Sequence, residues 1–226
     1  MKYIEIDVEY EPAITGSPNG IYAVEMKGEK SFRSKKEMVF FNEFIDANME
    51  NLQRVCDKNF VAIDEKNISE ITYFPSYKRT KDIDVVNYSP HQMGFQFLLS
   101  EKAFKIIKKY KMPKLNVIPA KIETFDKKYY MIGFPMIENE MIDFKLSTFY
   151  DHDLEKEVTY KNFKDYNQIN FSRNALNIHL KKSYNYDIIH LQGEGIYFSK
   201  SIIAEIEANE LIGFLIRKSM LHNETE

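Results

Sequence analysis

Two stretches of the chain, 94–111 and 195–213, share one pattern of hydrophobic and polar positions. In each, a glycine opens a short apolar run, a serine follows, and apolar residues then recur at helical spacing. Counted from Ser100 and Ser199, these apolar residues are Ala103, Phe104 and Ile107 in one copy and Ile202, Ile203 and Ile206 in the other. A serine at this place can accept a hydrogen bond from a free amide of the first helical turn. The pattern predicts a strand, a serine cap and an amphipathic helix, twice.

The N-terminal segment 2–10 alternates apolar and charged residues. A period of two predicts a half-buried strand rather than the continuous apolar run of a signal peptide. Turn-forming residues crowd into 15–20, so 21–26 is expected to return as a second strand. The protein is therefore expected to open with a β-hairpin.

A long helix is predicted next. Ser34 stands three residues before Glu37, the arrangement of a capping box. Apolar residues then follow at spacings of three and four, and the expected buried stripe is Met38, Phe41, Ile45, Met49, Leu52 and Cys56. Because Cys56 lies on that stripe, we interpret it as a small core residue rather than a nucleophile.

All periodicity is lost over 75–82, which marks either a candidate domain boundary or a long loop within one body. We expect a small N-terminal α+β subdomain at 1–80 and a larger α+β domain at 81–226. The fold class is then α+β, with mixed or antiparallel sheets and a few packed amphipathic helices. Further strands are expected at 60–63, 68–74, 83–86, 115–118, 120–125, 129–134, 188–191 and 211–216, with 120–125 and 129–134 forming a hairpin.

Two segments are harder to interpret. No period persists over 150–183, and no element is assigned there. The polar segment 219–226 is expected to be a mobile tail.

Composition bounds the class of protein. With 226 residues and 44% hydrophobic content, the chain can bury a sizeable core without disulfides, and its one cysteine allows no intrachain bridge. No stretch approaches the length of a membrane span, so no membrane partner is expected. The net charge of −3 offers no global attraction to nucleic acid or anionic lipid. We expect a cytoplasmic protein.

Catalytic, metal and cofactor motifs are sparse. No two of the five histidines have the zinc-hydrolase spacing, and neither Ser100 nor Ser199 lies in a nucleophile elbow. Phe198 stands where a dinucleotide fingerprint needs a third glycine, so no cofactor is expected. The best acid cluster around a histidine is Asp151-His152-Asp153, which could bind a metal or form a base with its orienting carboxylate, although a solvated turn is the commoner outcome.

Two charged segments are candidate interfaces. The first repeat helix carries Lys102, Lys105, Lys108, Lys109, Lys111 and Lys114, which could contact nucleic acid or simply form a solvated helix face. The opposite charge gathers over 137–157, where the candidate partner-binding residues are Glu138, Glu140, Asp143, Asp151, Asp153, Glu155 and Glu157. If these carboxylates share one face, they would dock a basic protein partner.

Three stretches, 94–107, 129–149 and 196–214, resemble bacterial immunity proteins of polymorphic-toxin and contact-dependent or type VI secretion systems. The most diagnostic piece is a Phe-Ser, a helix, and then a Leu-x-Gly-Phe strand. The resemblance covers about residues 83–216. The particular group that the chain resembles was long classified as a domain of unknown function. Its matching residues look structural, and they are Gly94, Ser100, Asp143, Ser147, Ser199 and Gly213.

The resemblance implies an α+β protein that binds and neutralises a toxin made by the same cell or its kin. It carries over no catalytic, cofactor or metal residue, and it does not say which residues face the toxin. Two alternatives from other classes stay open. One is an enzyme with a site dispersed over Tyr, His and Asp residues, and the other is a nucleic-acid module that uses the lysines of 102–114.

Overall fold

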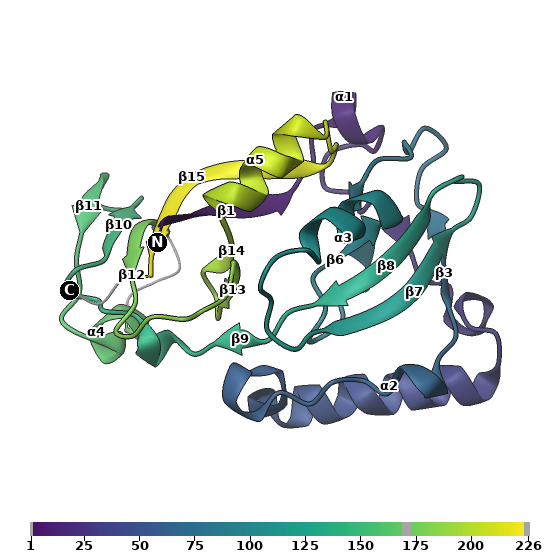
Figure 1. Cartoon of the computed structure of the whole chain (residues 1–226), viewed down its shortest axis with the longest axis horizontal. Helices are drawn as coiled ribbons and strands as arrows, with labels where there is room; N and C mark the ends of the chain where they lie inside the picture. Colours follow the sequence, from purple (N-terminus) through teal and green to yellow (C-terminus); the bar gives the residue numbers. More distant parts are fainter. Residues whose placement is uncertain (1, 169–172, 224–226) are drawn as a thin grey trace. The chain divides into compact units, whose positions relative to one another are not determined.

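The computed structural model describes residues 2–168 and 173–223, and its fold is α+β with two mixed sheets. The helices are α1 (Pro12–Thr15), α2 (Lys35–Glu50), α3 (Glu101–Ile107), α4 (Phe163–Asn167) and α5 (Lys200–Ala208) (Figure 1). The strands are β1 (Lys2–Val8), β2 (Val24–Glu25), β3 (Ile71–Pro75), β4 (Val85–Val86), β5 (Tyr88–Ser89), β6 (Phe97–Ser100), β7 (Asn116–Ile122), β8 (Lys128–Gly133), β9 (Met136–Ile137), β10 (Thr148–Asp151), β11 (Lys156–Val158), β12 (Arg173–His179), β13 (Ile188–Leu191), β14 (Gly195–Ser199) and β15 (Phe214–His222).

The chain forms two compact units. Unit 1 comprises Met1–Asp7, Met136–Glu205 and Ile216–Glu226, and unit 2 comprises Val8–Pro135 and Ile206–Leu215. This division differs from the expected one at residue 80, because the first strand of the chain pairs with strands near its end rather than with its neighbours in sequence.

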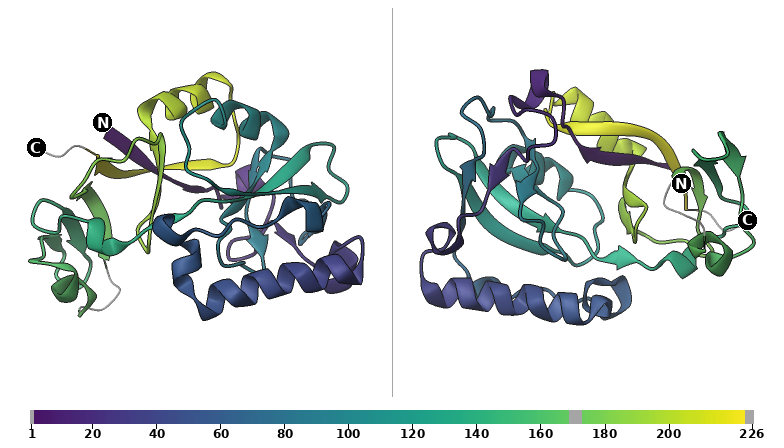
Figure 2. Two further views of the ribbon diagram at one scale, coloured as in Figure 1. Left: turned by 60° about the horizontal axis from the view of Figure 1, so that its bottom comes forward. Right: turned by 180° about the vertical axis from the view of Figure 1, so that it is seen from behind.

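Unit 2 contains a seven-stranded sheet in the order β4-β6-β8-β7-β3-β2-β5. The helices α2 and α3 cover opposite faces of this sheet (Figure 2). Phe41, Phe44 and Ile45 of α2 share a core cluster with Met131 of β8. On the other face the ring of Phe104 lies 4.9 Å from that of Tyr130. The alternation of side chains along β8 therefore supplies one layer of packing to each helix.

Unit 1 contains an eight-stranded sheet in the order β11-β10-β12-β15-β1-β14-β13-β9. The strand β1 pairs antiparallel with β14, so that Glu5 stands opposite Tyr197. The strands β12 and β15 pair in parallel. An aromatic cluster packs within this unit, where the Tyr166 ring lies 4.9 Å from that of Phe144 and 5.1 Å from that of Phe149.

The predicted N-terminal hairpin is wrong. The first strand exists, but 21–26 contains only the two residues of β2, which belong to the other sheet and pair with β3 and β5. A turn does lie in this region, where the Ile21 amide donates to the Pro18 carbonyl at 3.2 Å, but β1 pairs with β14, which is distant in sequence. The predicted strand at 60–63 is also absent, whereas β7 and β8 form the predicted hairpin.

The long helix is confirmed, and its buried face is partly different from the prediction. Ser34 accepts a hydrogen bond from the Glu37 amide at 3.2 Å, as a capping serine should. Phe41 and Ile45 are buried as expected, but Met49 in the last turn of α2 is exposed. Leu52 is also exposed, and it lies beyond the end of α2 at Glu50. Cys56 is buried in the core as predicted.

Both repeated units form the predicted strand and helix, as β6 with α3 and as β14 with α5. Ile202, Ile203 and Ile206 are all buried, whereas in α3 the buried residues are Ala103, Ile106 and Ile107. The two serines differ. The Ser100 hydroxyl accepts a hydrogen bond from the Ala103 amide at 3.1 Å, but the buried Ser199 hydroxyl has no partner among the residues that the structure describes, so the predicted second cap is wrong.

The last strand begins at Phe214 and continues to His222, so half of the expected mobile tail, 219–222, is part of the sheet. Ser219 and Asn223 are buried. The side chain of Asn223 donates to the Tyr3 hydroxyl at 2.9 Å and accepts from the Tyr184 amide at 2.7 Å. These bonds hold the end of the chain against β1, and only 224–226 of the expected tail lie outside the described residues.

The segment 150–183, which carried no sequence period, contains β11, α4 and β12 and the end of β10. For β11 and α4 the elements are short, and a strand of three residues or a helix of five cannot display a period. The strand β12 has seven residues, but burial does not alternate along it.

Candidate functional site

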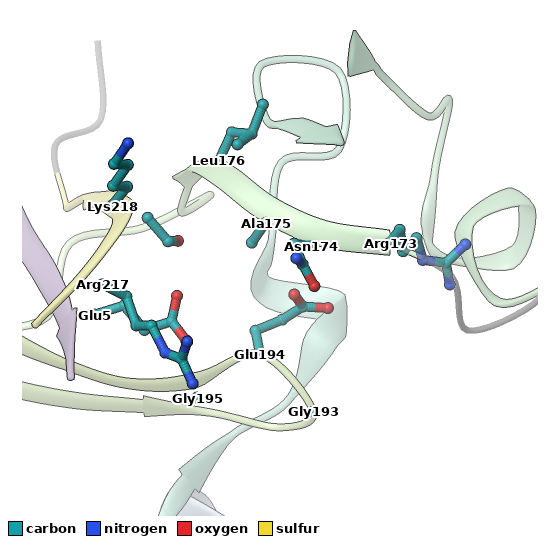
Figure 3. A pocket seen from close by; sticks show the side chains of 11 residues that line it. Glu5, Arg173, Asn174, Ala175, Leu176, Gly193, Glu194, Gly195, Arg217 and Lys218 are labelled. Carbon is teal, nitrogen blue, oxygen red and sulfur yellow. The ribbon is translucent and has the colours of Figure 1, made fainter. Parts of the chain in front are cut away.

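A pocket of about 470 Å³ opens on unit 1, and its lining comes from the strands β1, β12, β14 and β15 and the turn before β14 (Figure 3). Its charged and amide lining residues are Glu5, Arg173, Asn174, Glu194, Arg217 and Lys218. Charges of both signs therefore face one cavity. A volume of this size is ample for a charged side chain or a small molecule.

Glu5 comes from the alternating N-terminal strand. Its neighbour two residues back, Tyr3, is 1% exposed, so both side chains lie on the inward face of β1. Gly195 leaves room for the carboxylate, because a Cβ at that position would lie 3.2 Å from Glu5 Oε1. Burial raises the pKa of Glu5 from its ordinary value of 4.5 to about 7, although the Ser219 hydroxyl and the Arg217 guanidinium lower it, and Asp7 and Glu194 raise it further.

Glu194 lies on the turn between β13 and β14, where Gly193 and Gly195 flank it. Its Oε1 accepts a hydrogen bond from the Tyr166 hydroxyl. Burial raises the pKa of Glu194, and the bond from Tyr166 and the charge of Arg173 oppose that rise. Burial and the adjacent Glu194 carboxylate raise the pKa of Tyr166, so this hydroxyl keeps its proton and acts as a donor.

The two arginines of the pocket already have partners within the protein. Arg217 forms an ion pair with Asp7 at 2.7 Å. The Arg173 guanidinium lies 3.6 Å from the centre of the Tyr166 ring and 5.3 Å from that of Tyr160. Stacking on two aromatic faces stabilises this cation in place. The carboxylate of Glu5, by contrast, forms no ion pair with any residue that the structure describes.

The seven predicted acidic residues do not form a single surface. Asp151 is buried, and its Oδ1 accepts from the amides of Asp153 and Leu154, each at 2.9 Å. Asp143 likewise accepts from the Lys145 amide at 3.0 Å. These two carboxylates stabilise turns. Glu138 is half-buried beside β9, and Glu140 is exposed in a 3-10 turn.

The remaining three, Asp153, Glu155 and Glu157, are exposed together on the hairpin of β10 and β11. We call this segment the acidic hairpin. Leu154 stands at its tip and is 57% exposed. None of the three carboxylates forms an ion pair with another described residue. Of the seven predicted docking residues, Asp153, Glu155 and Glu157 therefore remain as candidates for one shared surface.

The segment Asp151-His152-Asp153 forms a turn, the commoner of the outcomes that its sequence allows. The carboxylate of Asp151 is bonded to backbone amides, and the exposed imidazole lies with its Nε2 3.0 Å from Asn174 Nδ2. Across 2–168 and 173–223, no group of three or more His, Cys, Asp or Glu side chains is placed to hold a metal ion. The contact with Asn174 nevertheless links the acidic hairpin to the wall of the pocket.

The lysines of the first repeat helix are partly engaged in contacts within unit 2. Lys102 Nζ donates to the Asn209 carbonyl at 2.7 Å, and Lys105 pairs with Glu101 at 3.0 Å. Lys108 lies 5.8 Å from the centre of the Phe104 ring. Three of the six lysines thus make a contact within the protein that can account for a lysine at that position.

Sequence reasoning missed Glu5, Glu194, Arg173 and Arg217. The first of these stands in a strand whose polar positions are expected to face solvent, and the others are separated from it by more than 160 residues. The only local signal was the Gly-x-Gly around Glu194. The motif does not match a nucleotide-binding fingerprint, because Phe198 occupies the third glycine position. In the structure the two glycines form a tight turn on either side of the Glu194 carboxylate.

Comparison of the sequence with protein-family models and with curated proteins finds no match to either at significant similarity. Within the described part of the chain, no helix combines the length and the apolar character needed to cross a lipid bilayer.

Proposed function

We propose that the protein is a bacterial immunity protein that binds a cognate toxin and blocks its active site or substrate channel by occupying it. The toxin would be the product of an adjacent gene in a polymorphic-toxin or type VI secretion system, and binding would take place in the cytoplasm. The observation that carries this proposal is the acidic hairpin, because it offers charge and an exposed leucine together on a turn that is held by buried residues.

The support of the hairpin comes from three contacts. Phe149 is fully buried and pairs with Val158 across the two strands. The buried Asp151 holds the turn through two amides. Since β11 is the edge strand of its sheet, the carboxylates of Asp153, Glu155 and Glu157 stand where a partner can approach.

Such a surface suits a basic protein. Carboxylates at the rim attract a positively charged partner over a distance and speed encounter, and an exposed leucine can be buried on contact. Leu154 would then supply the apolar anchor at the centre of the contact.

The test is co-expression with the product of the adjacent gene. We expect rescue of growth and a one-to-one complex on size-exclusion chromatography with light scattering. The triple variant Asp153→Lys, Glu155→Lys and Glu157→Lys should associate about tenfold more slowly at low salt, and the difference should shrink in high salt.

A matched control is available in unit 2. Reversal of Glu43, Asp46 and Glu50, which are exposed on α2, changes the net charge by the same amount. It should leave association nearly unchanged. If neither rescue nor a complex is seen, the proposed function is wrong, and if both triple variants slow association equally, the acidic hairpin is not the docking surface.

The alternative enzyme at Asp151-His152-Asp153 has less support, because the carboxylate of Asp151 is committed to the turn and the imidazole of His152 is exposed. Contacts of Lys102 and Lys105 within the protein likewise weaken the nucleic-acid alternative.

A further inference from the structure

We propose that the pocket of unit 1 receives a guanidinium or ammonium group from a basic side chain of the protein partner, with the carboxylate of Glu5 as its main ligand. This inference rests on the proposed function, since the cation belongs to the partner. It adds a specific pocket to a docking surface that otherwise depends on charge alone.

The acceptors in the pocket are arranged for a group with several N–H donors. Glu5 reaches the cavity from β1, Glu194 from the turn before β14, and Asn174 from β12 (Figure 3). A guanidinium carries five donors in a planar fork and can bond more than one acceptor at once. Three acceptors from three separate strands or turns surround the cavity in a way that suits such a fork.

An anion fits this pocket less well. Arg217 is paired with Asp7, and Arg173 stacks on the rings of Tyr166 and Tyr160. Nη1 of Arg173 has no hydrogen-bond partner among the described residues, but it is buried. An anionic ligand would have to replace these contacts, displace the groups that cover Nη1, or depend on the exposed Lys218. A cation would pair directly with Glu5, which has no ion-pair partner within 2–168 and 173–223.

One residue of the pocket wall contacts the acidic hairpin. Asn174 lines the cavity, and its side-chain nitrogen lies 3.0 Å from Nε2 of His152, the residue before Asp153. A basic segment that contacts the carboxylates of the hairpin can therefore extend one side chain into the pocket. Attraction at the hairpin and a specific ion pair at Glu5 would serve the same partner.

Protonation of Glu5 should make the binding of a cation to the pocket depend on pH. Near neutral pH about half of this carboxyl is protonated, because its pKa is raised to about 7. Several charged or titratable groups surround this carboxyl. They are Asp7 on the same strand, Glu194 in the turn before β14, Tyr197 on β14, Arg217 and Lys218 on β15, and Arg173 on β12. A cation binds the ionised form, so its binding releases a proton and is stronger at higher pH.

The experiment uses N-acetyl-L-arginine amide as the probe and N-acetyl-L-citrulline amide, which has nearly the same shape without the charge, as the matched control. Binding to the full chain is followed by NMR chemical-shift changes of the Gly193 and Gly195 amides. The ionised fraction of a carboxyl with a pKa near 7 changes about tenfold between about pH 6 and about pH 8, so the affinity for the arginine probe should rise by about that factor. Citrulline should not bind.

Glu5→Gln should lose the pH dependence and at least about tenfold in affinity, since a charge-assisted pair is removed. Glu43→Gln, at an exposed position of α2 outside the pocket and the hairpin, should bind the small probe like the wild type. Glu5→Gln should fold, because burial already favours a neutral side chain there, and far-UV circular dichroism checks this. Equal binding of arginine and citrulline, or unchanged arginine binding by Glu5→Gln, would overturn the inference.

The two proposals fail in distinguishable ways. If the toxin complex forms and the probe does not bind, the pocket is not a cation site and the immunity function stands. If the probe binds as expected and no partner is found beside the gene, the immunity function falls, and with it the assignment of the cation to a toxin.

Discussion

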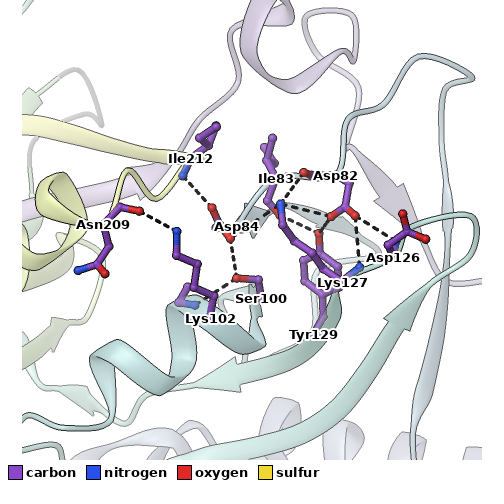
Figure 4. A network of polar contacts seen from close by, with 11 residues as sticks. Asp82, Ile83, Asp84, Ser100, Lys102, Asp126, Lys127, Tyr129, Asn209 and Ile212 are labelled. Atoms are coloured by element: carbon purple, nitrogen blue, oxygen red, sulfur yellow. Dashed lines mark hydrogen bonds and ion pairs between the residues drawn. The ribbon is translucent and has the colours of Figure 1, made fainter.

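Ser100 and Ser199 occupy equivalent places in the sequence, yet the structure predicts very different costs for their removal. Ser100 is 1% exposed, and its hydroxyl accepts from the Ala103 amide at 3.1 Å and donates to Asp84 Oδ1 at 2.7 Å (Figure 4). Asp84 also accepts from the Ile212 amide at 3.0 Å. Ser199 is equally buried, but its hydroxyl has no partner among the described residues.

The free energies follow from these contacts. Loss of an N-cap serine costs about 1 kcal/mol. Loss of a donor to a buried carboxylate costs about 1–3 kcal/mol, and the two effects overlap because one hydroxyl makes both bonds. Ser100→Ala should therefore lower the free energy of unfolding by about 2–3 kcal/mol. Ser199→Ala breaks no bond and removes a desolvated hydroxyl, so its effect should stay within about 0.5 kcal/mol.

Urea unfolding followed by far-UV circular dichroism and tyrosine fluorescence measures both changes, since the chain has no tryptophan. Hydrogen exchange at the first amides of α3 and α5 assigns each effect to its helix. Ser100→Thr, which keeps a hydroxyl, should recover most of the loss. Equal costs for the two alanine variants, or a cost below about 0.5 kcal/mol at Ser100, would refute the reasoning.

Two further predictions concern unit 1. Because the folded protein holds the proton of Glu5 up to about pH 7 while the unfolded chain releases it near its ordinary pKa of 4.5, the wild type should lose stability as pH rises between these values, and Glu5→Gln should not. Above about pH 7 the free energy of unfolding of Glu5→Gln should exceed that of the wild type by on the order of 2 kcal/mol, a figure reduced for the partial exposure of Glu5. A difference that does not change with pH would contradict the raised pKa of Glu5. Asn223→Ala removes bonds to Tyr3 and Tyr184 at a buried site and should cost about 3 kcal/mol in urea unfolding. Asn42→Ala, at an exposed position of α2, is the matched control and should be nearly neutral; similar costs would show that the end of β15 is not held by Asn223.

Local patterns predicted many of the elements correctly. The capping serine at Ser34, the hairpin of β7 and β8 and the two strand-helix repeats all depend on neighbours within a few residues, which the sequence displays directly. Of the seven candidate docking carboxylates in 137–157, Asp153, Glu155 and Glu157 are exposed together on one hairpin, and their role in docking stays a prediction. Asp151 and Asp143 look the same in sequence, but they stabilise turns through backbone amides.

Failures of prediction have a common cause in long-range pairing. The sequence predicted that 2–10 would be a strand, but not that this strand would pair with β14 or that 219–222 would complete the sheet. Each such pairing depends on hydrogen bonds between residues far apart in the chain, and no local period reports them.

The sequence by itself determined the α+β class, the position of the long helix, and the two strands that each lead into a helix, because hydrophobic periods and capping residues act over a few positions. Only the tertiary structure decided that Glu5 and Glu194 share one pocket, that Arg217 is paired with Asp7 while Arg173 stacks on aromatic rings, and that one repeat serine is a cap while the other has no bond. Burial and distance set the pKa of Glu5 and the roles of the serines, and both arise when distant strands come together.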